Sequence, residues 1–285
     1  MPNVLDIRRR IRSVRSTQQI TKAMKMVATA KLRKAQERAL DARPYANMIL
    51  EVLNSLVTRT ETRAHPLLQD RPEESIRLVV VTADKGLCGA FNTNIIKTAQ
   101  HFLEDRKDKN LTLCCVGRKG RDFFRKRPLP MTGEFVNLFN KFDYGDGRRI
   151  ATPLMQAFIT GEVDAIYLLF NEFKSMLQQR IIVERLLPIR QLTPSGQASL
   201  VDYIYEQTPQ EIFSNLLPKY VEIQVYRALL ESAAAEHAAR MTAMEAATDN
   251  ATELIDSLTL TMNRARQAGI TREIIEIVSG AAALG

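Results

Sequence analysis

The first sixty residues carry a helical pattern of apolar positions. Apolar side chains recur in steps of three and four, at Val4, Ile7, Ile11, Val14, Ile20, Met24, Val27, Leu32, Ala35 and Ala39. Because an α-helix turns once every 3.6 residues, this spacing places them along one stripe. No glycine interrupts residues 1–60. Pro44 is expected to kink the helix or end a segment, since proline lacks the amide hydrogen, and helix should resume through Leu56.

The pattern changes between about residues 74 and 192. Short apolar, β-branched runs predict strands at 76–82, 111–116, 165–170 and 180–187, with helices between them around 93–106 and 149–159. Near-continuous apolar strands that alternate with helices are typical of a largely parallel sheet. We therefore expect a small α/β, Rossmann-like domain over residues 74–192.

A second long helix is predicted after a turn-rich linker at 193–199. Thr208 to Glu211 (TPQE) has the residues of a capping box with proline at the first helical position. Pro218 should end a short first helix. The three-four repeat then runs through Tyr220, Ile223, Arg227, Leu230, Ala234, His237, Met241, Met244, Thr248, Ala251, Ile255, Leu258, Met262 and Ala265. A helix from 220 to about 283 would be ~95 Å long, so it must leave its own domain.

Each long helix needs a partner for its apolar stripe. Residues 1–45 hold twelve basic and three acidic residues, a net charge of +9, whereas residues 206–285 sum to −5. The pattern therefore predicts an antiparallel α-helical coiled coil formed by the N- and C-terminal helices, with the α/β domain inserted between them. Its arms would be residues 1–73 and 193–285. The alternative is that the two helices pair with other chains.

Composition excludes several classes. The chain has 285 residues, 45% of them hydrophobic, and a net charge of +8. Its longest uncharged stretch, 150–161, has twelve residues, too few for the ~18 of a membrane span. Three cysteines form no disulfide scaffold and suit a reducing compartment. The N-terminus has no apolar core of a signal peptide, so secretion is not expected.

No constellation of residues predicts catalysis. His65, His101 and His237 stand far apart without metal-ligand spacing, and His237 lies on the heptad stripe, where we expect it to be packed. Cys114 and Cys115 are neighbours on a strand and should point to opposite faces. The loop 84–92 (DKGLCGAFN) is the nearest approach to a phosphate-binding loop, but it lacks the Gly-Lys-Ser/Thr of that motif. A structural strand-to-helix turn is favoured there. No cofactor is predicted.

Two other functional classes stay open at this point. The basic N-terminal face could bind nucleic acid, as a coiled-coil scaffold would, although no aromatic residue for stacking precedes Tyr45. An enzyme with helical arms would bind a small ligand near the loop 84–92.

The C-terminal end has an unusual composition. Residues 277–285 (IVSGAAALG) are small, apolar and uncharged, and nine alanines fall within 233–251. Alanine favours helix and keeps a helical rod thin. A thin rod with a bare apolar tip suggests insertion into a sleeve; the alternative is a frayed end.

Several segments together resemble the gamma subunits of F-type ATP synthases. The segment 270–283 (ITREIIEIVSGAAA) matches the signature of that family. The segments 10–32, 85–92, 239–251 and 264–268 are also similar to it. The resemblance spans the whole chain and is most specific at its two ends.

The resemblance implies a central rotor shaft without an active site of its own. One copy would turn inside a ring of three alpha and three beta subunits, and its foot would bind the epsilon subunit and the membrane-embedded c-ring; nucleic acid would not be a partner. Because no transit segment precedes the heptads at Met1, we expect a peripheral protein on the cytoplasmic face of a bacterial membrane.

The resemblance also implies which residues contact partners. Lys22, Met24 and Lys25 are expected to face an acidic loop of a beta subunit. Arg266, Gln267 and Thr271 are expected to hydrogen-bond to beta-subunit loops. The tip that would sit in the sleeve comprises Ile277, Val278, Ala281, Ala282, Ala283 and Leu284.

Overall fold

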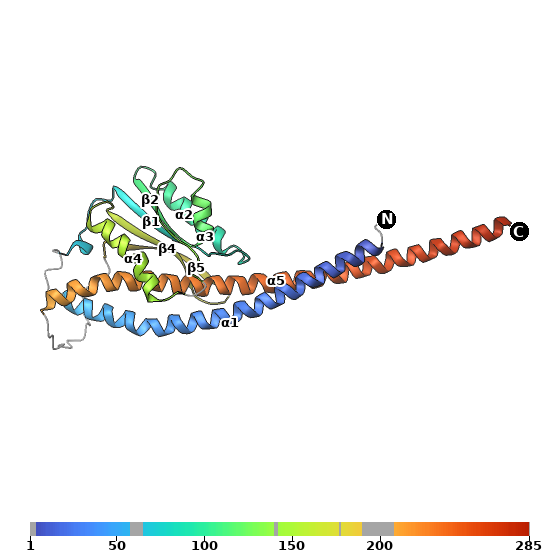
Figure 1. Ribbon diagram of the computed structural model, residues 1–285, viewed down its shortest axis with the longest axis horizontal. Coiled ribbons are helices and arrows are strands. Elements are labelled where there is room, and N and C mark those ends of the chain that lie inside the picture. The colour runs from blue at the N-terminus through green and yellow to red at the C-terminus, as the bar shows by residue number, and fades with distance from the viewer. Residues whose placement is uncertain (1–3, 58–64, 140–141, 177, 190–207, 285) are drawn as a thin grey trace. The chain divides into compact units, whose positions relative to one another are not determined.

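A computed structural model describes residues 4–57, 65–139, 142–176, 178–189 and 208–284 of the chain (Figure 1). Its contacts form two units. The coil unit contains residues 1–28 and 241–285, and the domain unit contains residues 29–240. The sequence-based division into 1–73, 74–192 and 193–285 stays a prediction.

Two long helices occupy the ends of the chain. Helix α1 spans Val4–Val57 and helix α5 spans Pro209–Leu284. The expected end of a short helix at Pro218 is wrong, because Pro218 lies inside the continuous helix α5. Helix α1 does not end at Pro44 either, and a kink there stays a prediction. An internal proline costs a helix roughly 3 kcal/mol in isolation. Around Pro218 the flanking turns, with Leu217 and Val221, are buried in the core of the domain unit, which offsets that cost, whereas around Pro44 the side chains of Ala42 and Ala46 pack only partly against it.

The start of α5 has the predicted cap. The amide of Glu211 donates to Oγ1 of Thr208 at 3.3 Å, and the amide of Thr208 donates to the Glu211 carboxylate at 3.2 Å. Two of the amides that a helix N-terminus leaves without intrahelical partners are thereby satisfied. The capping box is confirmed.

Five strands form the predicted sheet. They are β1 (Ser75–Val81), β2 (Asn110–Val116), β3 (Met131–Phe135), β4 (Ala165–Phe173) and β5 (Gln179–Leu187). Their order is β3-β2-β1-β4-β5, parallel throughout except for the antiparallel β4–β5 pair. The largely parallel sheet is therefore confirmed. Strand β3 was not predicted, because its five residues alternate in burial and include a glycine.

Shorter helices cover the sheet. They are α2 (Phe91–Glu104), α3 (Arg118–Phe124), α4 (Tyr144–Ile159) and the 3₁₀ turn η2 (Pro66–Leu68). Helix α4 begins five residues before the predicted start, at a capping box made by Asp143 and Asp146. Two glycines in its first turns hid this beginning from the periodicity. Helix α3 is too short to give a periodic signal.

The two faces of the sheet pack in separate cores. One core joins the sheet to α2 and α3, and contains Cys115 and Phe124. The other joins it to α1, α4 and α5, and contains Cys114. The adjacent cysteines therefore point to opposite faces as predicted. Both are reduced and buried, and burial raises the pKa of each thiol to about 12.

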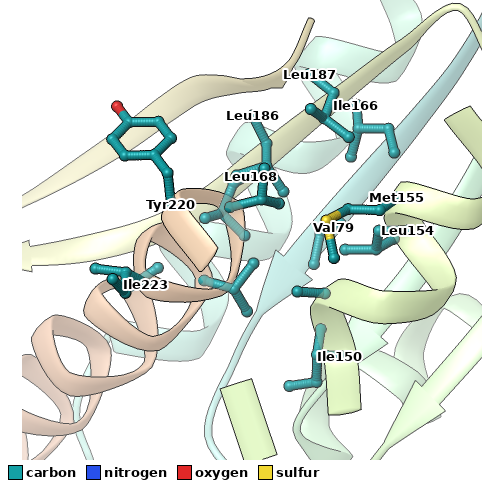
Figure 2. Packing of buried hydrophobic residues seen from close by; sticks show 14 of the residues in the cluster. Val79, Ile150, Leu154, Met155, Ile166, Leu168, Leu186, Leu187, Tyr220 and Ile223 are labelled. Atoms are coloured by element: carbon teal, nitrogen blue, oxygen red, sulfur yellow. The ribbon is translucent and has the colours of Figure 1, made fainter. Parts of the chain in front are cut away.

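Figure 2 shows how α4 and α5 meet the second face. Ile150 and Leu154 of α4, Ile223 of α5 and Leu168 of β4 belong to this one core. Leu168 is 2% exposed and Ile150 is fully buried. Gly147 allows the close approach of these two helices, since a Cβ there would lie 2.9 Å from Cβ of Tyr226.

Burial along α5 changes in three stages. Residues 228–238 are buried on every side of the helix. From 241 to 265 burial is confined to the predicted stripe, which includes Met244, Ala251 and Ile255. From 266 to 279 every side chain is exposed. One helix therefore serves successively as core, as half of a coiled coil and as an uncovered rod.

Candidate partner-contact surfaces

Three cross-helix contacts define the pairing in the coil unit. Gln18 Nε2 donates to Thr252 Oγ1 at 2.7 Å, and the Thr248 hydroxyl donates to Thr21 Oγ1 at 2.8 Å. Lys25 Nζ lies 2.5 Å from Glu245 Oε1. As the residue number rises on α1 it falls on α5. The antiparallel coiled coil within one chain is therefore confirmed.

The same contacts correct the predicted stripe between residues 18 and 28. The positions that face α5 are Gln18, Thr21, Lys25 and Ala28, in strict heptad spacing with Ile7, Ile11 and Val14 before them and Leu32 and Ala35 after them. Ile20 and Val27, expected inside, are each 57% exposed. In this segment polar residues occupy heptad positions that face α5. The apolar Ile20 and Val27 stand at other positions of the heptad and therefore face outward.

The proposed N-terminal contact residues lie at or beside Gln18, Thr21 and Lys25, the polar positions of α1 that face α5 (the polar seam). Lys22 is exposed, and Met24 and Lys25 are partly buried. The Lys25 ammonium pairs with Glu245 of the same chain. Met24 shares one side of α1 with the exposed Ile20 and Val27, and Lys22 lies on the opposite side of the helix. Sequence reasoning placed Ile20 and Val27 in the coil and so missed them as surface residues.

The C-terminal contact residues lie where the coil ends. In the pairing register set by Lys25 and Glu245, α1 begins at Val4, opposite residue 266. Arg266, Gln267 and Thr271 are exposed, and the Thr271 hydroxyl donates to the Gln267 carbonyl at 3.0 Å. Within the described residues, Arg266 therefore lies level with the first residue of α1, and Gln267 and Thr271 lie beyond it, with no facing helix.

The apolar tip is a helix without cover as far as its side chains are described. Ile277 is 71% exposed and Val278 is 62% exposed, and Ile274 one turn earlier is 55% exposed. The backbone stays helical to Leu284. The side chains of Ala281, Ala282, Ala283 and Leu284 lie outside the described residues. An exposed row of large apolar side chains marks an interaction surface.

The alanine-rich part of α5 has a different role from the predicted one. Ala233, Ala234, Ala235 and Ala238 are at most 2% exposed and pack within the domain unit. Small side chains here let α5 lie close to the sheet. The interpretation of this stretch as a thin free rod is therefore wrong for residues 233–238.

Helix α5 also occupies the crevice where α/β sheets usually bind ligands. Such ligands bind at the C-terminal strand ends where the strand order reverses, which here lies between β1 and β4. The amide of Asn171 donates to Ser232 Oγ at 3.3 Å, and the amide of Phe173 donates to Glu231 at 3.1 Å. The chain's own helix thus fills this position.

The loop after β1 is a structural turn, as predicted. The Asp84 carboxylate accepts hydrogen bonds from the amides of Arg118 at 3.0 Å and Asn137 at 2.8 Å. Arg240 of α5 donates to the Gly86 carbonyl at 3.1 Å. A carboxylate of the protein itself therefore takes backbone donors that an anionic ligand would use.

A buried charged cluster ties this loop to α5. Arg240 lies 2.7 Å from the Glu236 carboxylate and 3.4 Å from His237 Nδ1. Burial raises the pKa of Glu236, whereas burial, with Arg240 and Lys31, lowers the pKa of His237 to about 4. His237 is neutral at pH 7 and 7% exposed, which confirms the prediction that it is packed.

Other site classes find no support in the described part of the chain. No group of three or more histidine, cysteine or acidic residues there has the geometry of a metal site. No described helix is long and apolar enough to cross a membrane.

Comparison with known proteins gives a consistent result. A sequence model of the ATP synthase family matches residues 3–284. The ATP synthase gamma chain of Solibacter usitatus is 55% identical over 99% of both chains, and that of Heliobacterium modesticaldum is 50% identical over the full length of both.

Solved structures agree with the fold. A chain in the mitochondrial ATP synthase central stalk and c-ring of Tetrahymena thermophila is 27% identical, with a TM-score of 0.61, covering 80% of this chain and 99% of that one. A chain of the Euglena gracilis mitochondrial ATP synthase is 19% identical and shows the fold alone, with a TM-score of 0.69 and coverage of 99% and 94%. The chain belongs to the ATP synthase gamma chain family.

Proposed function

We propose that this chain is the central rotor stalk of an F-type ATP synthase and couples ion flow through the membrane sector to ATP synthesis or hydrolysis at the beta subunits. The observation that carries the proposal is the three-stage α5 of a gamma-family chain. It is clamped in the domain unit, paired with α1 in the coil unit, and uncovered beyond residue 266. Such a helix joins a foot to a rod that other subunits can surround.

The proposed coupling mechanism depends on the asymmetry of a single shaft inside a ring of three identical beta subunits. A single shaft cannot present the same side chains to three identical beta subunits at once, so each subunit meets a different face. A shaft shifts a site between open and closed states only by the difference in its contact free energy with those states. Rotation moves that difference from site to site. Each elementary charge that crosses about 100 mV supplies roughly 2.3 kcal/mol, so several ions must pass for each ATP.

The chain itself performs no chemistry in this proposal. Helix α5 fills the crevice that would hold a ligand in an α/β enzyme, and Asp84 engages the nearby backbone donors. Nucleotide would be bound by the ring of three alpha and three beta subunits. The epsilon subunit and the c-ring would bind the foot. The protein would lie peripherally on the cytoplasmic face of a bacterial membrane.

The contact residues are part of the proposal. Lys22, Met24 and Lys25 would face an acidic beta-subunit loop, and Ile277 and Val278 would lie in the sleeve of the ring, together with Ala281–Leu284. Arg266, Gln267 and Thr271 would hydrogen-bond to beta-subunit loops. Arg266→Ala combined with Gln267→Ala should impair growth on a non-fermentable substrate; normal growth would remove these two residues from the proposal.

Reconstitution tests the function directly. The purified chain is mixed with alpha and beta subunits, and the assembly is analysed by native mass spectrometry and ATPase assay. We expect an ATP-hydrolysing complex with one copy of this chain for three of each partner. A complex that forms equally well without this chain, or a different stoichiometry, would contradict the proposal.

A further inference from the structure

A cleft of about 340 Å³ lies within the domain unit between α1, α5 and the segment that joins β3 to α4. The two helices run side by side along the domain (Figure 1). Small-molecule sites commonly span about 300–1,000 Å³, so the cleft can take one small ligand. It is separate from the switch-point crevice that α5 fills and from the proposed contact residues.

Three cations form one wall of the cleft. Lys31, Lys34 and Arg38 line it from α1, and their spacing of three and four residues places them on one face of that helix. Arg38 Nη1 also donates to the Phe142 carbonyl at 3.5 Å. No acidic residue is among the described residues that line the cleft. The wall therefore favours an anionic group.

The opposite wall is apolar. Phe139 and Phe142 form an edge-to-face pair with centroids 5.9 Å apart, and Leu230 and Ala233 of α5 complete the surface. Ala35 faces the same space from α1. Alanines on both helices leave a volume that larger side chains would fill. On the α5 side, His237 is the one polar side chain among the described residues that line the cleft. A single imidazole offers too few hydrogen-bonding groups to recognise a nucleotide base.

We propose that this cleft binds a single-chain anionic amphiphile, such as a medium-chain fatty acid. The carboxylate would lie at Lys31, Lys34 and Arg38, and the hydrocarbon chain would pack on Phe139, Phe142 and Leu230. This site is independent of the proposed rotor function.

A second cavity adjoins the cleft and could hold the end of a longer hydrocarbon chain. It has a volume of about 290 Å³, shares Leu230 with the cleft, and is lined on α1 by Ala39, Ala42 and Ala46. The ring pair Phe142–Tyr226, at 6.1 Å, connects the walls of the two cavities. A longer chain can therefore extend along the alanines of α1, opposite a wall that contains Glu172, Arg227 and Glu231. Each buried CH₂ contributes about 0.8 kcal/mol, or up to about fourfold in affinity.

Calorimetric titration of the full-length chain with fatty acids below their micellar concentrations tests the proposal. We expect one saturable site for dodecanoate, with affinity at least tenfold higher than for octanoate. Dodecanol, which lacks the charge, and pyrophosphate, which lacks the chain, should each bind at least tenfold more weakly than dodecanoate. Vesicles of an anionic phospholipid, at a lipid concentration low enough to leave the free dodecanoate unchanged, should not compete, because a two-chain lipid exceeds the cleft.

Variants separate this site from general surface binding. Lys31→Gln combined with Lys34→Gln should weaken dodecanoate binding about tenfold or more, and Ala35→Leu should do so by filling the cleft. Lys126→Gln, an exposed lysine on another surface, is the matched control and should bind normally. Circular dichroism verifies that each variant is folded. Absence of a saturable site, equal binding of pyrophosphate, competition by the vesicles, or unchanged affinity in the double lysine variant would overturn the proposal.

Discussion

The hydroxyl oxygens of Thr21 and Thr248 lie 2.8 Å apart across the coiled coil. Thr21 is 8% exposed and also donates to the Gln18 carbonyl at 3.0 Å. A hydroxyl pair at a position that usually holds leucine or isoleucine fixes register at some cost in stability. The coil is therefore specified by polar contacts in the segment nearest the proposed N-terminal contact residues.

Replacing these threonines by valine should show that the pair acts as a unit. Each single substitution, Thr21→Val or Thr248→Val, should destabilise the chain by up to about 1 kcal/mol, because it removes the contact between the two hydroxyls while each remaining hydroxyl keeps its backbone carbonyl, Met244 for Thr248 and Gln18 for Thr21. The double variant should lose less than the two single effects together. Urea denaturation of the four proteins measures this cycle, and strictly additive effects would show that the contact carries no coupling.

Gly147 should be intolerant of a side chain. An alanine Cβ there would lie 2.9 Å from Cβ and 3.3 Å from Cα of Tyr226, so Gly147→Ala should cost about 1–3 kcal/mol through overpacking. Gly269 lies on the exposed part of α5 with nothing within 4 Å. Gly269→Ala should therefore stabilise the helix by up to about 1 kcal/mol. Thermal denaturation compares the two, and equal shifts would refute the close approach of α4 and α5.

His237 should make stability fall in mild acid. The pKa of His237 is lowered to about 4 in the folded chain, against the ordinary value of about 6.5 for a histidine, so between those values the unfolded state binds the additional proton. Its contribution is nil above pH 6.5 and destabilising below, reaching about 2 kcal/mol at pH 5. Glu236, whose pKa burial raises, acts in the opposite direction.

A histidine variant isolates this contribution. His237→Asn should lose less stability than the parent chain between pH 7.5 and pH 5, as measured by urea denaturation at both values. An identical pH dependence in the two proteins would mean that His237 titrates normally in the folded chain.

Charge reversal distinguishes the roles of the two seam lysines. Lys22→Glu should leave stability within ~0.5 kcal/mol, since the residue is exposed, but should reduce coupled ATPase activity in the assembled complex. Lys25→Glu should also repel Glu245, its present partner. The swap Lys25→Glu with Glu245→Lys restores the internal pair. If the swap restores stability but not coupling, Lys25 acts toward a partner; full recovery of both would confine it to the coil.

The sequence predicted the architecture well because its signals were long. The repeat from Tyr220 to Ala265 matches burial at nearly every position, with Arg227 turned outward to pair with Glu184 at 2.6 Å. The parallel strands β1, β2 and β4 were also predicted, since each contains a nearly continuous apolar run. By contrast, the five residues of β3 and the seven of α3 are too few for a periodic signal.

The incorrect predictions concern side chains whose burial depends on their position in the heptad repeat or on their packing partners, and not on whether they are apolar. Ile20 and Val27 were assigned to the coil because they are apolar, yet strict heptad spacing from Ile7 places Gln18, Thr21 and Lys25 there. The alanines of α5 gave no sign of whether they pack or lie in solvent. Only the packing partners decide this, and they lie far away in the chain: Asn171 of β4, for example, hydrogen-bonds to Ser232 of α5.

Rotation of this chain within the ring of alpha and beta subunits can be observed directly. The three native cysteines are buried, so Lys107→Cys, at an exposed position of the α/β domain, provides a single attachment point for a bead. The assembled alpha–beta complex is fixed to a surface and supplied with ATP. If this chain is the rotor, the bead will rotate stepwise in one direction. ATP hydrolysis at the normal rate while the bead stays stationary would contradict the proposal.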